Sequence, residues 1–243
     1  MHCALLKINP DNMGTAMLPK QILSVQHPFV KQCVALRTDA DVRRELGQVL
    51  VMGKNMIQDL QGKIALERIE GPPEVLKKIT GLPQPDGWVA IAPLPQPREV
   101  ANAKRTLVLD QISDPGNLGT LLRTAWGLGW DAVVFTPGTV DPFNDKALRA
   151  SKGAPFFLPF CTKTPEEIVG SFDNVYVADL DGTPLHEVQP TTPLALVLSS
   201  EARGLSSWAE KLGNKIQIPM HHGVDSLNVA VSGGILLYCL GKT

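Results

Sequence analysis

The chain has 243 residues, of which 44% are hydrophobic and 19% charged, with a formal net charge of −1 at pH 7. This length suits one large domain or two modest ones, and the composition is ordinary for a globular protein. No apolar run approaches the ~20 residues of a membrane span. The near-neutral charge excludes a polybasic surface of the kind that drives non-specific nucleic-acid binding.

Seven prolines fall within residues 72–97, and the last three (Pro93, Pro95 and Pro97) are typical of a semi-rigid linker. We therefore place a domain boundary near residue 100, with domains at 1–100 and 101–243. In the first domain, patterning predicts helices at 28–36, 42–46, 53–60 and 74–79, and strands at 48–53 and 87–92. This is a small mixed α/β domain.

The second domain alternates strands and helices. Strands are expected at 105–109, 131–135, 174–178, 194–198 and 215–219, and helices at 117–128, 144–151, 165–171, 206–212 and 226–240. This alternation predicts a parallel sheet with helices on both faces. Ligands bind beyond the carboxyl ends of such strands, so the loops after residues 109, 198 and 219 are expected to carry the chemistry.

The first of these loops contains Asp114-Pro115-Gly116-Asn117, a strong turn signal in which Asp114 or Asn117 can cap the next helix. Arg123 lies away from the apolar stripe of that helix, so it is either a solvated surface residue or points into a cleft. Gly116 and Gly119 imitate a dinucleotide fingerprint. Their spacing is not G-x-G-x-x-G, so a Rossmann oxidoreductase is a distant alternative.

In the second loop, Ser206 can cap a helix at 206–212. In the third loop, His221 and His222 are adjacent. The side chains of adjacent residues rarely point at the same ion, so we expect no metal. A serine hydrolase is excluded because no G-x-S-x-G elbow exists. The apolar run 226–237 opens with Ser226 and Asn228. Ser226 is therefore either a plain helix cap or part of a site at the helix N-terminus.

Taken together, three segments resemble the SpoU (TrmH-type) branch of the SPOUT RNA methyltransferases. They are Leu109–Ala125 with its Asp114-Pro115-Gly116-Asn117-Leu118-Gly119 core, Leu196–Ser206, and Ile218–Val229 with the helix behind it. They occur in family order and span 107–238. The segments 24–31 and 50–53 resemble, more loosely, the family's small ribosomal-protein-like RNA-binding domain.

The resemblance implies a parallel-sheet SPOUT fold with a C-terminal trefoil knot, an exception to the rule against threaded chains. It also implies S-adenosylmethionine as cofactor, no metal, and a homodimer with its active sites at the interface. The implied reaction is methyl transfer to a ribose 2′-hydroxyl of tRNA or rRNA.

Two residue sets carry over from the family motifs. The cofactor-binding positions are Leu198, Ser199, Gly204, Ile218, Met220 and Leu227, and the catalytic positions are Asn117, Arg123, Glu201, Ser226 and Asn228. Arg123 would orient the ribose-phosphate through its planar fork rather than act as a base, because guanidinium stays protonated. Glu201 would brace the loops or Arg123. Asn117, Ser226 and Asn228 would hold the hydroxyl and the cofactor.

Two positions depart from the family pattern, since glycine is usual at Ser199 and common at Ala202. Ser199 adds a hydroxymethyl group beside the expected cofactor. With the modest charge and the short first domain, it favours an alternative from another class: a catalytically weak RNA-binding or assembly factor. The five retained polar residues favour the enzyme.

Candidate RNA contacts form two basic sets, each of which could equally be a solvated helix face. They are Arg37, Arg43 and Arg44, and Lys146, Arg149 and Lys152. The four cysteines (Cys3, Cys33, Cys161 and Cys239) have no ligand spacing, which predicts a reducing compartment and no structural zinc. Lys7 and Asn9 interrupt any signal-peptide core. We expect a cytoplasmic protein, or an organellar one if a transit peptide has been removed.

Overall fold

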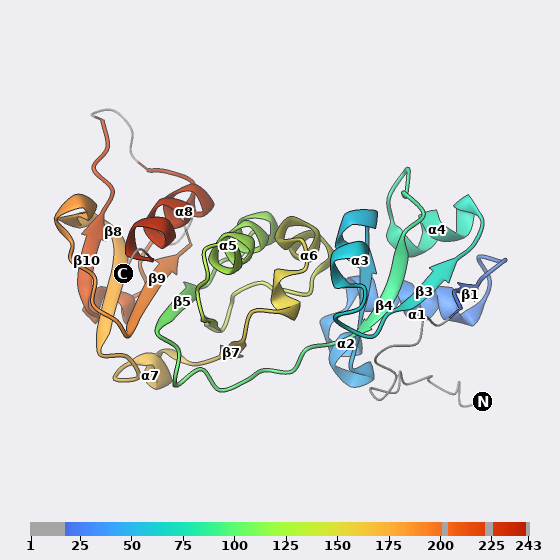
Figure 1. Cartoon of the computed structure of the whole chain (residues 1–243), viewed down its shortest axis with the longest axis horizontal. Coiled ribbons are helices and arrows are strands. Elements are labelled where there is room, and N and C mark those ends of the chain that lie inside the picture. Colours follow the sequence, from blue (N-terminus) through green and yellow to red (C-terminus); the bar gives the residue numbers. More distant parts are fainter. Residues whose placement is uncertain (1–17, 201–203, 222–225, 242–243) are drawn as a thin grey trace. The chain divides into compact units, whose positions relative to one another are not determined.

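The computed structural model describes residues 18–200, 204–221 and 226–241 (Figure 1). It divides into two compact units. Unit 1 is Met1–Gln96 with Phe143–Gly153, and unit 2 is Pro97–Pro142 with Ala154–Thr243. The division at residue 96 falls within the proline-rich segment. The segment 143–153 packs with unit 1, although its place in the sequence is inside the second predicted domain.

Unit 1 contains a four-stranded sheet in the order β1-β3-β4-β2. Its strands are β1 (Lys20–Gln21), β2 (Gln48–Met52), β3 (Glu67–Glu70) and β4 (Val89–Pro93). Strands β2 and β3 run antiparallel to β4, whereas β1 runs parallel to β3. The sequence did not predict β1 and β3, because a two-residue strand and the run Glu-Arg-Ile-Glu contain no apolar stretch.

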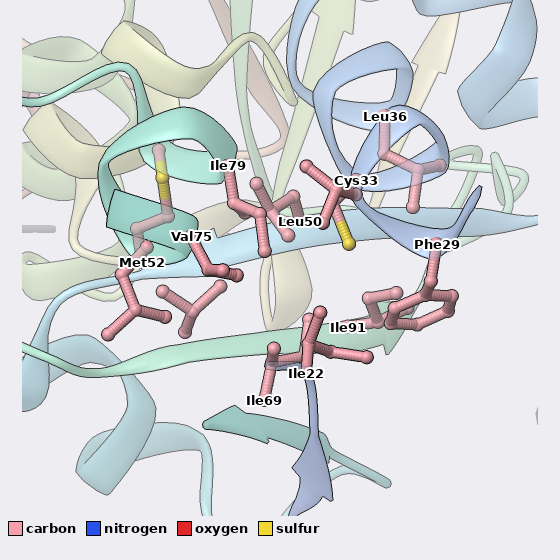
Figure 2. Packing of buried hydrophobic residues seen from close by; sticks show 13 residues of the cluster. Ile22, Phe29, Cys33, Leu36, Leu50, Met52, Ile69, Val75, Ile79 and Ile91 are labelled. Atoms are coloured by element: carbon pink, nitrogen blue, oxygen red, sulfur yellow. The ribbon is translucent and has the colours of Figure 1, made fainter. Parts of the chain in front are cut away.

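The helices of unit 1 are α1 (Pro28–Thr38), α2 (Ala40–Leu46), α3 (Lys54–Leu60), α4 (Pro73–Thr80) and α6 (Asp145–Ser151). Figure 2 shows how side chains of α1 and α4 meet those of the sheet in one apolar core, with Ile79 and Ile91 among its fully buried members. Cys33 also lies there, and burial raises the pKa of its thiol to about 12. This cysteine is therefore a small apolar core residue and an unreactive thiol.

Helix α6 joins unit 1 through small and apolar residues. Asn144 caps it by accepting a hydrogen bond from the Lys146 amide at 3.0 Å. Gly153 follows the helix in the left-handed region at φ 79°. A Cβ atom added there would be in van der Waals contact with Met56 and Leu60. The sequence predicts this helix correctly, but local periodicity does not say which core a helix will join.

Unit 2 contains a six-stranded sheet in the order β10-β8-β9-β5-β6-β7. The strands are β5 (Arg105–Asp110), β6 (Ala132–Phe135), β7 (Phe160–Thr162), β8 (Asn174–Pro184), β9 (Leu194–Ser199) and β10 (Asn214–Gln217). Every neighbouring pair is parallel, which confirms the predicted parallel sheet. The short edge strand β7 was not predicted.

The α-helices of unit 2 are α5 (Pro115–Gly127), α7 (Pro165–Ile168) and α8 (Val229–Leu240). Three 3₁₀ turns accompany them, at Ala154–Phe156, Leu185–Glu187 and Ala209–Lys211. The predicted helix at 206–212 is wrong, because only the short turn 209–211 forms there. Its sequence, Ser-Ser-Trp-Ala-Glu-Lys-Leu, is too short to nucleate a helix without strong packing.

Helices α5 and α8 pack together beside β9. Leu118, Leu121, Leu122 and Ala125 form the buried stripe of α5, as predicted. A Cβ atom added at Gly233 of α8 would overlap the side chains of Leu121 and Leu198. The glycine therefore permits the close approach of α8 to both elements.

Candidate active site

The carboxyl ends of β5, β9 and β10 lie at one edge of the sheet, because parallel strands all point the same way. The segments beyond them bring together residues far apart in the chain. A pocket of about 220 Å³ lies among the segments that follow β9 and β10, the distal part of β8 and the start of α8.

Apolar side chains form most of this pocket, with several hydroxyls and one carboxylate among them. Its lining residues are Ala178, Asp179, Leu180, Leu198, Ser199, Ser200, Gly204, Leu205, Ile216, Ile218, Met220, Ser226, Leu227, Val229, Ser232 and Leu236. Leu198, Ile216 and Leu236 are each 1% exposed, so the walls are continuous with the core of unit 2.

All six residues that the sequence analysis assigned to the cofactor line this one pocket: Leu198, Ser199, Gly204, Ile218, Met220 and Leu227. They come from two of the three motif segments, 196–206 and 218–229, and Ser226 joins them from the predicted catalytic set. Their common location is a property of the fold. Their contact with a ligand stays a prediction.

A buried carboxylate joins three of the segments behind the pocket. Asp110, 1% exposed at the end of β5, accepts hydrogen bonds from the hydroxyls of Thr136 at 2.8 Å, Ser206 at 2.7 Å and Ser199 at 3.2 Å. We call these four residues the Asp110 cluster. Three donors satisfy the buried charge, which would otherwise be costly to hold away from water. The cluster therefore fixes both ends of the segment 199–206.

Asp110 was not among the predicted site residues, although a polar residue directly after an apolar strand signalled it. Ser206 donates its hydroxyl to this carboxylate, so its predicted role as a helix cap is wrong. The cluster also explains the departure at Ser199. A hydroxymethyl group stands here in place of the usual glycine hydrogen, and its hydroxyl donates to Asp110.

Two predicted catalytic residues contact each other directly. The Asn228 side-chain amide donates to Asn117 Oδ1 at 3.0 Å, although the two residues are 111 positions apart. Asn228 also caps α8 by accepting from the Ala230 amide at 3.0 Å, so of the two alternatives for Ser226 the helix cap is wrong. Asp114 caps α5, as one of the two predicted alternatives stated.

Arg123 lies on α5 with an exposed side chain, away from the buried stripe of that helix. It does not line the pocket of unit 2. Of the two interpretations that the sequence left open, the structure therefore supports a solvent-exposed Arg123 side chain rather than one that points into a cleft of the same chain. Glu201, and with it Ala202 and Arg203, lies outside the described residues.

A second carboxylate, Asp179, lines the pocket and was also missed from sequence. Its side chain forms an ion pair with Lys215 of β10 at 2.7 Å and accepts from the Leu180 amide at 2.7 Å. Burial acts to raise the pKa of Asp179. The hydrogen bonds from Lys215 and the Leu180 and Asp181 amides, with the charge of Lys215, outweigh it and hold the pKa below its ordinary value. The Asp179 hydrogen bond correspondingly raises the pKa of Lys215.

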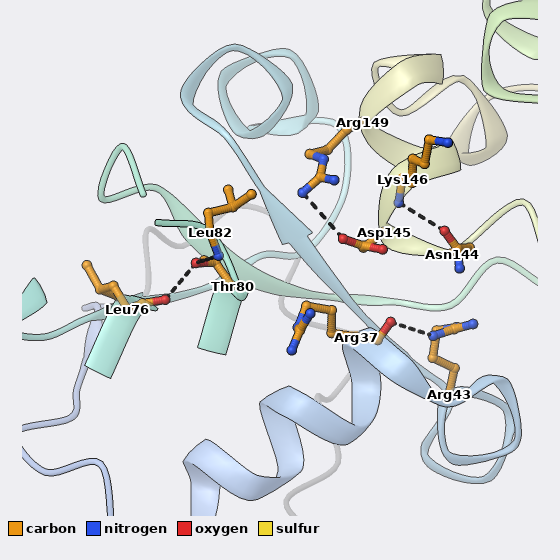
Figure 3. A network of polar contacts seen from close by, with 9 residues as sticks. All are labelled: Arg37, Arg43, Leu76, Thr80, Leu82, Asn144, Asp145, Lys146 and Arg149. Atoms are coloured by element: carbon orange, nitrogen blue, oxygen red, sulfur yellow. Dashed lines mark hydrogen bonds and ion pairs between the residues drawn. The ribbon is translucent and has the colours of Figure 1, made fainter. Parts of the chain in front are cut away.

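The two candidate basic sets both fall in unit 1, where several of their members have structural partners (Figure 3). Arg43 is buried and donates to the carbonyl oxygens of Leu36 at 2.8 Å and Arg37 at 3.3 Å, which closes the end of α1. Arg149 pairs with Asp145 at 3.3 Å. Arg43 is thus unsuited to RNA contact, while Lys146 and Lys152 are not fully buried.

The assignment of 143–153 to unit 1 changes the charge balance. Unit 1 carries 14 Lys and Arg against 10 Asp and Glu, a formal charge of +4, and unit 2 carries 9 against 14, a charge of −5. A division at residue 100 gives 12 Lys and Arg against 10 Asp and Glu (+2) for the first part and 11 against 14 (−3) for the second, so the charge is more segregated between the two units.

Within the described residues, no group of three or more His, Cys, Asp or Glu side chains could hold a metal ion. Over the same part of the chain, no helix has the length and apolar character needed to cross a bilayer.

The comparison with protein families identifies residues 104–238 as a match to the SpoU rRNA Methylase family. This match covers more than half of the chain and includes β5, the pocket and nearly all of α8. The chain belongs to the SpoU rRNA Methylase family. The SpoU resemblance expected from the three sequence motifs is confirmed.

Two curated relatives extend the comparison. The 23S rRNA (guanosine(2553)-2'-O)-methyltransferase RlmP of Bacillus subtilis (strain 168) is 34% identical over 173 residues, which cover 69% of each chain. An uncharacterised tRNA/rRNA methyltransferase of Synechocystis sp., slr1673, is 30% identical and covers 89% of this chain and 92% of that protein.

Among solved structures, an AdoMet-bound rRNA methyltransferase from Sinorhizobium meliloti superposes with a TM-score of 0.81. It is 24% identical, and the match covers 91% of this chain and 97% of that chain. At this identity the likeness concerns the fold, which is the predicted SPOUT-type α/β fold. The trefoil knot stays a prediction.

Proposed function

We propose that the chain is an S-adenosylmethionine-dependent methyltransferase that acts on a ribose 2′-hydroxyl of tRNA or rRNA. One observation carries the proposal. The six residues assigned to the cofactor from the family motifs, drawn from two segments, line a single apolar pocket of about 220 Å³ at the carboxyl edge of a parallel sheet.

The pocket fits the adenosine part of the cofactor chemically. Leu198, Ile216, Ile218 and Leu236 offer apolar surface to a purine ring, and Ser200 and Ser226 offer polar contacts at its border. When bound, S-adenosylmethionine supplies a methyl group on a positively charged sulfur. No strong nucleophile is needed in the protein, because the RNA hydroxyl provides the attacking oxygen.

The Asn117–Asn228 pair is suited to orienting that hydroxyl. One hydrogen bond joins the two side chains, and the Asn117 amide nitrogen still carries two N–H groups for a ligand. A ribose 2′-hydroxyl is a poor nucleophile, so its orientation toward the methyl group is where the protein can gain most.

Arg123 is proposed to hold the phosphate next to the target ribose. A guanidinium binds phosphate oxygens through two parallel N–H groups, and its exposed position on α5 leaves it accessible. Glu201 and Ser226 complete the proposed set, Glu201 as a brace for the neighbouring loop.

Unit 1 is proposed to bind the RNA. Its formal charge of +4, against −5 for unit 2, favours attraction of a polyanion to this unit. Of the candidate cations, Lys146 and Lys152 of the α6 segment and Arg44 of α2 are better suited to this than the buried Arg43.

We further propose that the chain forms a homodimer through α8. This helix is apolar on nearly every side, yet Val231, Ile235 and Tyr238 are 54%, 37% and 53% exposed. Their spacing places them along one face of the helix. Covering this stripe with a second copy would explain why a helix of such composition leaves it uncovered, and would allow Arg123 to act at a subunit interface.

For the compartment we propose a reducing one, either the cytoplasm or the interior of an organelle. Cys33, Cys161 and Cys239 are all free thiols, and the buried Cys33 and Cys161 have raised thiol pKa values, mainly through burial.

The test combines two measurements. Titration calorimetry with S-adenosylmethionine asks whether the pocket binds the cofactor, and no binding at millimolar ligand would leave only the RNA-binding or assembly factor. Mass spectrometry of tRNA and rRNA nucleosides from cells lacking the protein should reveal one missing 2′-O-methylated nucleoside, which would identify the substrate.

A further inference from the structure

Strand β8 leaves the sheet for a short distance beside the pocket. Its residue Val177 pairs with Lys215 of β10, but the next residue of β10, Ile216, pairs with Thr183. The segment 178–182 therefore has no partners on β10, and three of its residues (Ala178, Asp179 and Leu180) form part of the pocket wall. We call residues 178–182 the β8 bulge.

The β8 bulge is a built feature, held at its far end. A Cβ atom at Gly182 would lie 2.6 Å from the Lys215 carbonyl carbon, so only glycine permits the backbones to approach this closely. The Gln217 side-chain amide donates to the Gly182 carbonyl at 2.7 Å. These contacts fix where the bulge ends, and the ion pair with Lys215 holds Asp179 within it.

Asp179 carries the only ionisable side chain among the described residues that line the pocket. The Asp179 side chain is 19% exposed, and its partner Lys215 is 39% exposed. The ion pair and the low pKa keep the carboxylate charged at neutral pH. An apolar pocket with one oriented carboxylate calls for a ligand with hydrogen-bond donors at that point.

The carboxylate retains capacity for such a ligand. Two oxygens offer about four acceptor positions, of which the Lys215 ammonium and the Leu180 and Asp181 amides use three. A nucleoside presents two neighbouring hydroxyls on its ribose, and the remaining acceptor position can accept a hydrogen bond from one of them. The same chemistry operates in dinucleotide-binding sheets, where an acidic side chain binds a ribose hydroxyl.

On the basis of the proposed function, we propose that Asp179 is a cofactor-binding residue that accepts a hydrogen bond from a ribose hydroxyl of S-adenosylmethionine. Lys215 positions it by holding the carboxylate against the wall. The bulge thus gives this chain a side-chain determinant for the ribose in a pocket whose other described walls are apolar or carry hydroxyls.

The test is calorimetry with S-adenosylhomocysteine and with its 2′,3′-dideoxy analogue, on the full chain, Asp179→Ala, Asp179→Asn and Asp181→Asn. Asp181 lies two residues further along the same bulge, is exposed and does not line the pocket, so it is the matched control. We expect Asp179→Ala to raise the Kd for S-adenosylhomocysteine about 10- to 100-fold, the loss of a hydrogen bond to a charged group. Asp179→Asn, which keeps one acceptor, should raise it less.

The dideoxy analogue distinguishes the ribose from the other parts of the ligand. Its Kd for the full chain should be higher than the Kd for S-adenosylhomocysteine, and Asp179→Ala should leave it unchanged. An equal loss for both ligands would mean that Asp179 contacts the amino-acid part or merely shapes the pocket, and would overturn the inference. A Kd that neither Asp179 variant changes, in proteins whose melting temperatures stay close to that of the unmodified chain, would also overturn the inference. If the unmodified chain binds neither ligand, both the inference and the proposed function fail.

Discussion

Two polar groups lie near the same edge of the unit 2 sheet and have opposite structural character. The Asp110 cluster is centred on a carboxylate that is 1% exposed and whose oxygens accept three hydroxyl donors. The Asn117–Asn228 pair has one mutual hydrogen bond, at 3.0 Å, and spare donors. Nearby, Arg123 is exposed.

The difference distinguishes a polar group that stabilises the structure from one that is available to a substrate. A buried polar group with all its partners supplied by the protein stabilises the loops that bear the pocket. A partly exposed group with spare donors can meet a substrate. Substitutions in the two groups should therefore affect different measured quantities.

The largest effect is expected from Arg123→Ala. If Arg123 contacts RNA during transfer, the rate of methyl transfer should fall about 100- to 1,000-fold, the usual loss for one charge-stabilising donor. The Kd for S-adenosylmethionine should stay unchanged, because Arg123 does not line the pocket. Single-turnover methylation and calorimetry measure the two quantities.

Arg98→Ala is the matched control, since Arg98 is an exposed arginine of the same unit outside the proposed site. It should leave both the rate and the Kd unaltered. Normal turnover by Arg123→Ala would remove Arg123 from the mechanism.

Asp110→Asn should have the opposite profile. Replacing the carboxylate weakens the bonds from Ser199, Ser206 and Thr136, so the free energy of unfolding should fall by about 1.5–3 kcal/mol. The Kd for S-adenosylmethionine should rise about tenfold, because the segment 199–206 is no longer fixed. Urea denaturation and calorimetry provide the values.

Asp131→Asn controls for the loss of a carboxylate elsewhere. Asp131 accepts from the Arg105 amide at 2.8 Å near the amino end of β5, at the opposite edge of the sheet. This variant should lose some stability and keep its cofactor affinity. A cofactor affinity preserved in Asp110→Asn would contradict the assigned role of the cluster.

Sequence patterning predicted the parts of this site that depend on local order. The apolar strands β5, β6 and β9 and the capped helix α5 follow from apolar runs and turn signals, and the six pocket residues follow from the resemblance to the SpoU family. The pairing of Asp110 with Ser199 and Ser206 spans 89 and 96 residues, so no local pattern reveals it. The β8 bulge escaped prediction for the same reason, since it exists only relative to β10.

The position of α6 shows another limit. Periodicity identified a helix at 144–151, but the core that it joins depends on the packing of α6 against β2, about 100 residues earlier in the chain. Similarly, α8 is apolar on nearly every side, yet Val231, Ile235 and Tyr238 are exposed. A surface that a second chain would cover cannot be told from core by composition alone.

Ser199→Ala should have a smaller effect than Asp110→Asn. It removes one of three donors to Asp110, so we expect a loss of about 1 kcal/mol in the free energy of unfolding. Cofactor affinity should change by less than about threefold, because the hydroxyl is engaged by Asp110. Tenfold tighter binding would mean instead that the Ser199 hydroxyl hinders the cofactor.

The smallest expected effect is on the pH dependence of stability. The folded-state pKa of Asp179 is lowered, so the carboxylate stabilises the fold above the ordinary carboxyl pKa, and this contribution is lost as the pH falls through the lowered value. Asp179→Asn should therefore differ from the unmodified chain in denaturation at neutral pH and converge with it at an acidic pH below the lowered pKa of Asp179. An equal difference at both pH values would contradict the assignment.

The central claim is that the exposed polar group acts on a ribose hydroxyl while the pocket holds the cofactor. The most direct test incubates the chain with methyl-labelled S-adenosylmethionine and total tRNA and rRNA from cells lacking the protein, followed by nucleoside mass spectrometry. The account predicts label in one 2′-O-methylated nucleoside, and its loss with Arg123→Ala but not with Arg98→Ala. Label on a base, or equal labelling by both variants, would contradict it.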